Sequence, residues 1–349
     1  MNFNIASLPG DGIGPEVAAS IKPVLEKVGS LFSHEFNIEE YLIGGAAIDA
    51  TGSALPDDTL VACKKADAVF LAAIGGPKWD QSDIRPEQGL LKLRSELSVY
   101  ANIRPLTMYS KLEAASPLKP EILAGTDFII VRELTGGIYF GQKNRHSDYA
   151  TDECKYSVTE VERIARVAFE LAQQRNKKLT SVDKANVLET SKLWREVVTR
   201  IGKDEFPDVE LHHQLVDSCA MKLIQSPSEF DVILTENMFG DILSDEASVL
   251  AGSMGLLASS SVGNQHGLFE PIHGSAPDIA GRGIANPYAT ILSIAMMLRW
   301  LKLTEEASAI ERAVEAVIEQ GILPVDLQPE SKLTTQQAID AVVKEIRCQ

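Results

Sequence analysis

The stretch FDVILTENMFGDILSDEASVLAG, residues 230–252, combines two patterns that together indicate the fold class. Residues 230–237 form a short apolar run that ends in polar residues, as a buried strand does. The residues that follow are typical of the opening of a helix, in which Asp241 and Asp245 stand four positions apart and therefore share one face. A strand that leads into a helix is the building unit of an α/β protein.

The two carboxylates on this face would repel each other, so we expect a positive group close to Asp241 and Asp245. Acidic residues also favour the start of a helix, where they complement the positive end of the helix dipole, and a solvated acidic face needs no ligand. A metal site on this face therefore requires further ligands from elsewhere in the chain.

Short apolar runs alternate with longer amphipathic segments along the rest of the chain. Further strands that end in polar or glycine residues are predicted at residues 67–76, 126–134, 178–186 and 209–217. Helical periodicity predicts helices at residues 158–175 and 287–301. The pattern favours an α/β architecture, in which functional groups usually gather at the carboxyl ends of the strands.

Composition sets the broad class. A chain of 349 residues with 45% hydrophobic content can bury a large core, and we expect two domains between which the chain crosses more than once. The net charge of −16 disfavours nonspecific binding to nucleic acid or to an anionic membrane surface. The four cysteines show no metal or disulfide spacing, and neither a signal peptide nor a membrane span is indicated. We expect a soluble, cytoplasmic protein.

The N-terminal glycine loop LPGDGIGPE, residues 8–16, suggests a dinucleotide site but fails the usual fingerprint. The third glycine of G-x-G-x-x-G would fall at position 15, where the chain has Pro15. The loop instead predicts a tight turn from a strand into a helix, with Pro15 at the first helical position.

Three arginines follow in a pattern that suggests an anionic ligand. Arg94 lies in LLKLRSEL, Arg104 in YANIRP, and Arg132 at the end of FIIVREL. Guanidinium groups bind carboxylates and phosphates in a bidentate manner. A single arginine is usually a surface residue, but the apolar strand before Arg132 would carry it toward the interior, where an unpaired charge is costly.

Three further polar residues are candidates for chemistry. Tyr139 can be a turn aromatic, Lys184 a cation at a strand end and Asp217 a helix N-cap, or the first two can act as acid and base in a polar site. Asp217, Asp241 and Asp245 together would suit a hard divalent cation such as Mg²⁺ or Mn²⁺. The long loop at residues 268–287 is either a surface loop or a binding loop.

Nine motifs occur in the order found in one family. They are LPGDGIGPE, GGPKWD, GLLKLRSEL, YANIRP, VRELTGGIYFG, DKANVLETSKLWR, VDSCAMKLI, TENMFGDILSDEASVLAGSMG and EPIHGSAPDIAGRGIANP. From about residue 4 to beyond residue 300 the chain resembles the isocitrate/isopropylmalate dehydrogenase family of metal-dependent β-decarboxylating dehydrogenases. The resemblance implies a two-domain α/β fold with mixed sheets flanked by helices, distinct from a conventional Rossmann fold.

The resemblance also implies a domain division and an activity. A discontinuous nucleotide-binding domain would comprise residues 1–99 plus 253–349, and residues 100–252 would form the substrate, metal and dimerisation domain. The implied reaction is NAD-dependent oxidative decarboxylation of (2R,3S)-3-isopropylmalate to 4-methyl-2-oxopentanoate and CO₂, a step of leucine biosynthesis.

Site roles are carried over from the family by position. Arg94, Arg104 and Arg132 match the arginines that grip the substrate carboxylates, and Tyr139 and Lys184 match the catalytic acid/base pair. Asp217, which also meets the substrate, matches a ligand of Mg²⁺ or Mn²⁺ together with Asp241 and Asp245. In the family Lys184 and Asp217 reach the site from the partner subunit, so a homodimer with shared active sites is implied.

The family's cofactor site maps onto the glycine loop, the loop after residue 268 and one residue near Lys184. The matching residues are Ile13, Asn186, His273, Gly274, Ser275, Ala276, Pro277, Asp278, Ile279 and Asn286. Asp278 would accept hydrogen bonds from the ribose hydroxyls and repel a 2′-phosphate, whereas NADP users of the family carry a cation and a tyrosine in this region. The resemblance therefore implies NAD.

Substrate choice depends on a few apolar positions. Glu87, Leu90 and Leu91 match the segment that meets the substituent at C3, and Val187 would complete an apolar wall around an isopropyl group. The serine and asparagine of isocitrate users are absent. A difference of about one methylene group in the pocket discriminates by only ~1 to 3 kcal/mol, so malate, tartrate and related alkylmalates remain alternatives. A noncatalytic regulatory subunit or a phosphate-binding scaffold would leave the filled catalytic positions unexplained.

Overall fold

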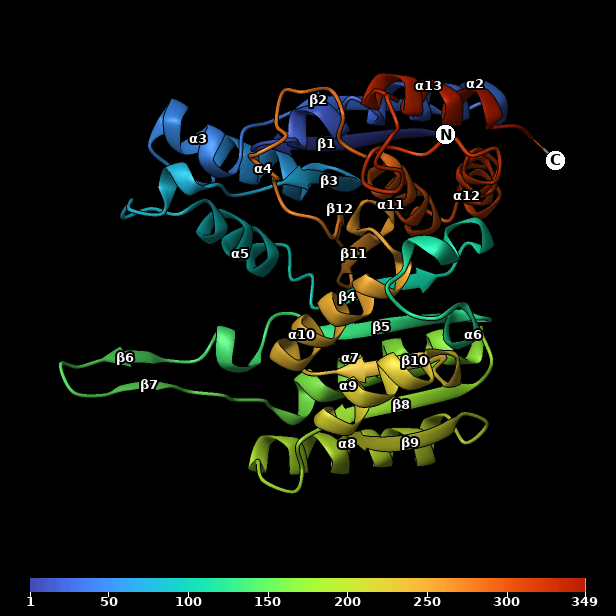
Figure 1. Ribbon diagram of the computed structural model, residues 1–349. Coiled ribbons are helices and arrows are strands. Elements are labelled where there is room, and N and C mark those ends of the chain that lie inside the picture. The colour runs from blue at the N-terminus through green and yellow to red at the C-terminus, as the bar shows by residue number, and fades with distance from the viewer. Residues whose placement is uncertain (349) are drawn as a thin grey trace. The chain divides into compact units, whose positions relative to one another are not determined.

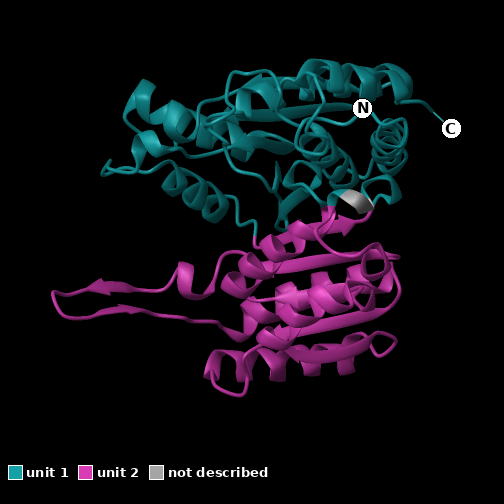
Figure 2. Cartoon of the chain, in the orientation of Figure 1, with its two compact units in different colours: residues 1–99, 109–115, 252–349 teal, residues 100–108, 116–251 magenta. Residues whose placement is uncertain are grey.

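The computed structural model describes residues 1–348, apart from the side chains of residues 113 and 114. The chain forms two compact units (Figure 2). Unit 1 contains residues 1–99, 109–115 and 252–349, and unit 2 contains residues 100–108 and 116–251. The sequence-based division placed residues 109–115 and 252 with the second domain; residues 109–115 belong to unit 1 because Leu112 is buried in its core.

Unit 1 is built on sheet strands that are hydrogen-bonded in the order β2-β1-β3-β12-β11 (Figure 1). The strands are β1 Asn2–Gly10, β2 Glu35–Glu40, β3 Ala68–Ala73, β11 Ala258–Val262 and β12 Gly267–Pro271. All are parallel except β11, which runs antiparallel to β12. The helices are α1 Gly14–Ala18, α2 Ile21–Phe32, α3 Gly44–Thr51, α4 Asp57–Lys65, α5 Pro86–Glu96, α11 Tyr288–Trp300, α12 Thr304–Glu319 and α13 Thr335–Glu345.

Helices cover both faces of this sheet, which explains why its central strand is apolar throughout. Phe70 of β3 packs into one hydrophobic core with residues of α2, α11 and α12, whereas Val69 and Leu71 pack into a second core that includes Leu93 of α5. Successive side chains of a strand point to opposite faces, so a strand buried on both sides reads as a continuous apolar run.

Unit 2 contains sheet strands that are hydrogen-bonded in the order β4-β5-β10-β8-β9. The strands are β4 Ala101–Thr107, β5 Asp127–Glu133, β8 Lys178–Asp183, β9 Glu210–Leu215 and β10 Val232–Thr235. All are parallel except β4, which runs antiparallel to β5. The helices are α6 Pro120–Leu123, α7 Val158–Gln173, α8 Glu189–Glu205, α9 Val216–Gln225 and α10 Asn237–Ser248.

A separate hairpin of β6 Lys143–Arg145 and β7 Ala150–Asp152 projects from the rest of unit 2 (Figure 1). Short 3₁₀ turns complete the two units: η1 Pro77–Trp79, η2 Ser110–Ala115, η3 Gly137–Tyr139, η4 Pro227–Glu229, η5 Val249–Ala251 and η6 Met254–Leu256. No helix within residues 1–348 is long and apolar enough to span a membrane.

The elements predicted from the sequence are confirmed. Each of the five apolar runs contains a strand, and the two helical segments correspond to α7 and α11. Helix α7 begins at a capping box, because Ser157 Oγ accepts from the Glu160 backbone N–H at 3.3 Å and the Glu160 carboxylate accepts from the Ser157 N–H at 2.7 Å. The mixed sheets flanked by helices agree with the expected fold class.

The parallel strands of unit 2 bring five of the candidate residues to one edge of the sheet. Arg132 lies at the carboxyl end of β5, Lys184 directly follows β8, and Asp217 follows β9. Helix α10, which carries Asp241 and Asp245, follows β10. Because the carboxyl ends of parallel strands meet at the same edge, residues far apart in the sequence become neighbours there.

In unit 1, one buried carboxylate ties three loops together. Asp11 is 4% exposed and accepts hydrogen bonds from the backbone N–H groups of Gly45 at 2.8 Å, Ala46 at 2.8 Å and Gly75 at 2.9 Å. The glycine loop is thereby joined to the start of α3 and to the loop after β3. Without Asp11, these buried donors would lose their acceptor.

We predict that Asp11→Ala lowers the free energy of unfolding of unit 1 by roughly 3 to 5 kcal/mol, because each lost bond leaves a buried N–H unpaired. Differential scanning calorimetry should show a melting temperature lower by roughly 10 °C. Asp58→Ala, which removes an exposed carboxylate from the first turn of α4, is the control and should change melting little. Equal melting of the two variants would contradict the structural role of Asp11.

Candidate active site

Helix α10 presents one polar face toward the end of β5. The helix starts after Glu236, whose carboxylate accepts from the Phe239 N–H at 2.6 Å as an N-cap. One turn into the helix, a Cβ added to Gly240 would lie 2.7 Å from Cγ of Arg132. Glycine at this position therefore lets the arginine side chain pass across the helix.

Arg132 is held by groups from this face. The arginine is 4% exposed, its Nε donates to Oδ1 of Asn237 at 3.0 Å, and its Nη1 pairs with Oδ1 of Asp241. The hydroxyl of Tyr139 donates to the other oxygen of Asp241 at 2.9 Å, and the Arg132 guanidinium lies 5.8 Å from the centre of the tyrosine ring. Burial and the bond to Asp241 raise the pKa of Tyr139 to about 12, so the phenol is protonated at neutral pH.

Arg104 makes a matching set of contacts with the next turn of α10. Its Nε donates to Oδ1 of Asn102 at 2.8 Å, and its Nη1 donates to Ser244 Oγ and lies 3.5 Å from Oδ1 of Asp245. The expectation of positive groups beside Asp241 and Asp245 is confirmed, and the groups are two arginines. Each carboxylate that would repel its neighbour has a cation of its own.

Lys184 and Asp217 form a separate ion pair between Nζ and Oδ1. The bond from Lys184 lowers the pKa of Asp217. The N-cap interpretation of Asp217 is wrong, because Leu215 occupies that position and Asp217 is the second residue of α9. Among the side chains that the structure describes, no group of three or more His, Cys, Asp or Glu is arranged to hold a metal ion. Asp217 therefore does not join Asp241 and Asp245 within one copy.

The third arginine belongs to unit 1. Arg94 of α5 pairs through Nη2 with Oε1 of Glu270 at 2.7 Å, and both side chains are largely buried. Its Nε is buried and has no hydrogen-bond partner among the described residues. A buried N–H of a charged group without an acceptor is costly, so this nitrogen is a donor suited to a ligand.

The residues expected to meet the substrate's alkyl group lie in two places. Glu87 is exposed in the first turn of α5, Leu90 packs partly against the core and Leu91 is 38% exposed. Val187, after β8 in unit 2, is 64% exposed. Leu91 and Val187 are thus accessible to a ligand, whereas Leu90 is partly buried.

The glycine loop and the loop after β12 form one structure in unit 1. Gly12 has φ +60°, and a Cβ there would meet the carbonyl oxygen of Ser275 at 2.0 Å. The N–H of Ile13 donates to that same carbonyl at 2.8 Å. Pro15 is the second residue of α1 rather than the first, so the expected turn into a helix is found with a shift of one position.

The loop after β12 offers polar groups that the chain leaves unused. His273 Nδ1 contacts the Gly274 carbonyl at 3.0 Å, while Nε2 is buried without a partner among the described residues. Burial lowers the pKa of His273, so the ring is neutral at pH 7. Asp278 is exposed.

Two other predicted cofactor residues have different surroundings. The amide of Asn286 accepts from the Tyr288 N–H at 3.0 Å and donates to Asp326 at 3.0 Å, which fixes the start of α11. Asn186 is exposed in the loop after β8 and belongs to unit 2. Asn286 therefore has an evident structural function of its own.

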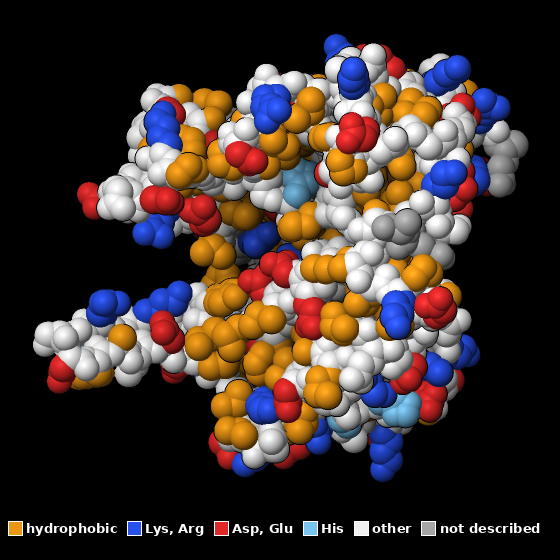
Figure 3. Space-filling view, viewed as in Figure 1, with side chains coloured by type: hydrophobic (Ala, Val, Ile, Leu, Met, Phe, Trp, Pro, Cys, Tyr) orange, Lys and Arg blue, Asp and Glu red, His pale blue; other side chains and the backbone are white. Residues whose placement is uncertain are grey.

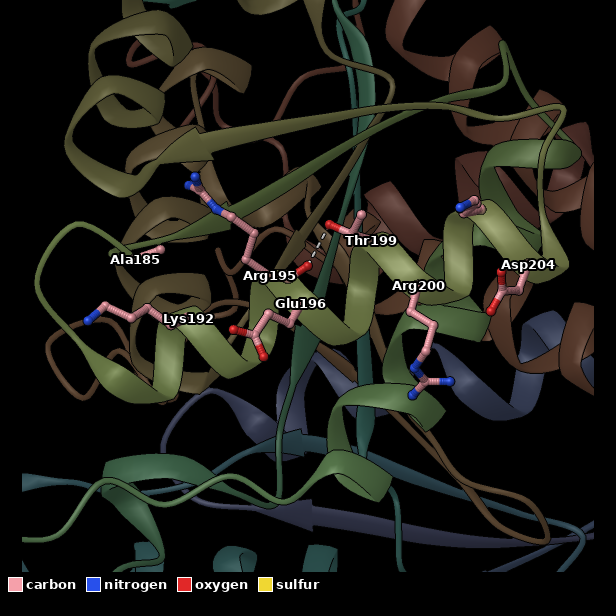
Figure 4. Close-up of a pocket in the computed structure, with 8 residues that line it drawn as sticks. Ala185, Lys192, Arg195, Glu196, Thr199, Arg200 and Asp204 are labelled. Atoms are coloured by element: carbon pink, nitrogen blue, oxygen red, sulfur yellow. Dashed lines mark hydrogen bonds between the residues drawn. The ribbon is translucent and has the colours of Figure 1, made fainter.

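A shallow groove of about 820 Å³ runs along α8 (Figure 4). Its basic side chains are Lys192, Arg195, Arg200 and Lys203. Three of these four already have acidic partners, since Lys192 pairs with Glu189, Arg195 with the buried Asp183, and Arg200 with Glu162. The groove contains none of the predicted site residues, and its charge is largely neutralised locally.

Sequence reasoning missed the neutral partners of the arginines. Asn102 and Asn237 are both 0% exposed, and each binds the Nε of one predicted arginine. Asn102 precedes Arg104 by two positions on β4, so the two side chains share a face of the strand. This spacing of two could have predicted the contact between Asn102 and Arg104. Nothing in the sequence connects Asn237 to Arg132, which lies 105 residues earlier.

Comparison with known proteins places this geometry in a family. The family model described as isocitrate/isopropylmalate dehydrogenase matches residues 4–342. A curated 3-isopropylmalate dehydrogenase of Geobacillus kaustophilus is 56% identical over 337 residues, covering 94% of this chain and 91% of that protein. The Bacillus subtilis protein of the same name is 54% identical over 355 residues, covering 99% and 97%.

A solved structure supports the same family assignment. The crystal structure of isocitrate dehydrogenase from Methylococcus capsulatus has a TM-score of 0.89 and 36% sequence identity, and the match covers 99% of both chains. The match of the family model spans nearly the whole chain, and the motifs around Arg132, Tyr139 and Asp241 form one connected group. The chain belongs to the isocitrate/isopropylmalate dehydrogenase family.

Proposed function

We propose that this protein catalyses the NAD-dependent oxidative decarboxylation of 3-isopropylmalate to 4-methyl-2-oxopentanoate and CO₂, as a step of leucine biosynthesis. The observation that carries the proposal is the grouping of Arg104, Arg132 and Tyr139 around the two carboxylates of α10. The identity of 56% to a curated relative of that name supports the choice of substrate.

The arginines are assigned to the substrate carboxylates. Arg104 and Arg132 are each held through Nε and Nη1, so the positions of their guanidinium groups are set before a ligand arrives. Arg94 has a buried Nε without an acceptor among the described residues, and a carboxylate oxygen would satisfy it. The same cations would bind malate or tartrate, so they set the class of substrate rather than its alkyl group.

The donor set on α9 and α10 fits a divalent cation. Asp217, Asp241 and Asp245 have side chains 63%, 37% and 64% exposed and offer hard carboxylate oxygens of the kind that Mg²⁺ and Mn²⁺ prefer. When bound, the cation supplies positive charge that stabilises the developing oxyanion at C2, and NAD⁺ accepts the hydride. Asp241 and Asp245 lie one turn apart on α10 and would hold the ion from one side.

Two side chains are assigned to proton transfer. Lys184 would accept the proton of the C2 hydroxyl, which requires a neutral amine. In the single chain its Nζ is paired with Asp217 Oδ1, so the assignment requires Asp217 to bind another cation instead. Tyr139 would donate a proton to C3 after CO₂ has left, and its high pKa keeps that proton in place until then.

The cofactor is assigned to the paired loops of unit 1. The buried Nε2 of His273 lacks a partner among the described residues and a Cβ on Gly274 would meet nothing within 4 Å, so this surface has an open hydrogen-bonding group and open space. The other unit 1 residues assigned to NAD are Ile13, Ser275, Ala276, Pro277, Asp278, Ile279 and Asn286, and Asn186 of unit 2 is assigned to it as well. Asp278 is exposed, and its charge favours NAD over a 2′-phosphorylated cofactor.

The decisive experiment measures NADH formation at 340 nm with Mn²⁺ and with 3-isopropylmalate, D-malate, D-tartrate or isocitrate in turn. We predict a preference of orders of magnitude in kcat/KM for 3-isopropylmalate with NAD⁺, because Leu90, Leu91 and Val187 supply the apolar surface. Chelation with EDTA should abolish the signal and Mn²⁺ should restore it. A malate or tartrate preference would overturn the alkyl pocket, and absence of any NADH would favour a noncatalytic subunit.

We further infer that the active enzyme is a homodimer, in which Lys184 and Asp217 serve the site of the other copy. Support comes from exposed apolar side chains on and beside α9 and α10, namely Met221 at 61%, Ile242 at 58% and Val249 at 49%. Figure 3 shows hydrophobic side chains gathered on this face of unit 2. The β6–β7 hairpin is exposed along both strands, and an isolated two-stranded hairpin is only marginally stable in water.

Hybrid dimers test the sharing of sites. Lys184→Met and Tyr139→Phe should each abolish turnover as pure dimers while largely sparing NAD binding. After the two variants are mixed by denaturation and refolding, about one quarter of wild-type activity should return, since half of the dimers are hybrids and each hybrid has one intact site. If Lys184 served its own chain, no hybrid would contain an intact site and activity would stay absent.

Cofactor choice has its own test. Asp278→Lys should raise the KM for NAD⁺ and lower that for NADP⁺, because it replaces a negative charge that repels the 2′-phosphate by a positive one. Glu305→Lys, an exposed change of the same sign in the first turn of α12, controls for the altered net charge. An unchanged ratio of kcat/KM for the two cofactors would show that the loop has been misassigned.

The cysteines are consistent with the expected cytoplasmic location, which we retain as part of the proposal. Cys63 and Cys219 are buried free thiols, and no disulfide occurs in the part of the chain that the structure describes. Burial raises the pKa of both thiols to about 12, which makes them unreactive. Free buried thiols are typical of a reducing compartment.

A further inference from the structure

Arg104 and Arg132 share a contact that none of the assigned roles explains. In each, Nε donates to the side-chain oxygen of an asparagine that is 0% exposed: Asn102 at 2.8 Å and Asn237 at 3.0 Å. The two asparagines come from different elements, β4 and the first residue of α10. On the neighbouring strands, Asn102 is also the register partner of Arg132.

Each arginine is thus fixed at two nitrogens. Nη1 of Arg132 binds Asp241, and Nη1 of Arg104 binds Ser244 and lies near Asp245. A guanidinium group is planar and its N–H bonds lie in that plane, so acceptors at two of its nitrogens hold its orientation. Asp241 and Asp245 are also the proposed metal ligands, and a bound cation would compete for their charge. The asparagines are neutral and would keep their bonds to Nε in either case.

The side-chain amide of Asn237 has only one orientation that satisfies its hydrogen bonds. Its NH₂ group donates to the carbonyl oxygens of Leu134 at 3.1 Å and Gly136 at 3.0 Å, so only Oδ1 can face Arg132. Its backbone N–H donates to the Tyr156 hydroxyl at 3.0 Å. Asn237 therefore links Arg132, the start of α10 and the turn that leads to Tyr139. An aspartate would present oxygens to both carbonyls and could not replace it.

We propose that Asn102 and Asn237 are positioning residues, which hold the guanidinium planes of Arg104 and Arg132 in the orientation that binds the substrate carboxylates. This inference rests on the proposed function, because it takes these two arginines to be substrate ligands. Preorganised cations bind a ligand without the entropy cost of ordering long side chains. Loss of the amide oxygen leaves the arginine in place but lets its plane rotate.

The test is calorimetric titration of 3-isopropylmalate into the full-length protein with Mg²⁺ and without NAD⁺. Asn102→Leu, which keeps the number and branching of the side-chain heavy atoms but removes the acceptor, should weaken the Kd by about 10- to 100-fold. Asn102→Asp retains Oδ1 and should bind more tightly than the leucine variant. Asn237→Ala should weaken the Kd by a similar factor. The Kd for NADH alone should stay within about two-fold of wild type in every variant.

A double-mutant cycle separates positioning from general damage. In the Arg104→Lys background no guanidinium is left to orient, so Asn102→Leu should weaken the Kd by less than about two-fold further. A loss of the same factor in both backgrounds would overturn the proposal, as would wild-type affinity of Asn102→Leu. If Asn237→Ala fails to fold, the Asn102 cycle decides alone.

The same data distinguish failure of this inference from failure of the proposed function. If Arg104→Lys and Arg132→Lys bind 3-isopropylmalate as tightly as the wild type, the arginines are not substrate ligands and the assignment of the site fails. If these variants lose affinity while Asn102→Leu and Asn237→Ala do not, the site assignment stands and only the positioning role is wrong. Thermal melting of each variant controls for loss of folded protein.

Discussion

The buried positive charge of Arg132 is the constraint on which unit 2 depends. A guanidinium at 4% exposure is unstable without hydrogen-bond acceptors, and α10 supplies them through Asn237 and Asp241. The helix can do so only because Gly240 leaves room for the side chain to cross. The end of β5 and the start of α10 are therefore fixed to each other by the same contacts that create the candidate site.

Stability and function make different demands on the α10 carboxylates. In the single chain, Asp241 and Asp245 neutralise Arg132 and Arg104, so the charged cluster is satisfied by the protein's own groups. The proposed chemistry requires the same carboxylates to hold a cation and the same arginines to face an anionic substrate. Cation and substrate would replace the internal pairs with equal numbers of charges, which keeps the cluster neutral overall. The buried asparagines are the members of the cluster that this exchange leaves unchanged.

Periodicity and strand ends predicted much of the fold and of the site, because both are local properties of the sequence. The apolar runs located the strands, and their polar ends pointed to Arg132, Lys184 and the residues after β10. Asn237 could not be found in this way, because its partners at Arg132, Leu134 and Gly136 are more than 100 residues away. A pattern of charged residues also cannot reveal a neutral residue such as Asn237. Residues 109–115 were misplaced because a short segment gives too little periodicity to reveal which core it joins.

The glycine loop has a structural role although it fails the Rossmann fingerprint. In a Rossmann fold the three glycines serve the turn, the approach of pyrophosphate and helix packing. Here Gly12 is required because the backbone at Ser275 lies against it, and the Ile13 N–H is used on that same carbonyl. The loop thus supports a second loop, in which His273 and Asp278 present the groups assigned to the cofactor. Because Gly12 and Ile13 contact the Ser275 backbone, this turn does not depend on the third glycine of the fingerprint, and Pro15 stands in the first turn of α1 instead.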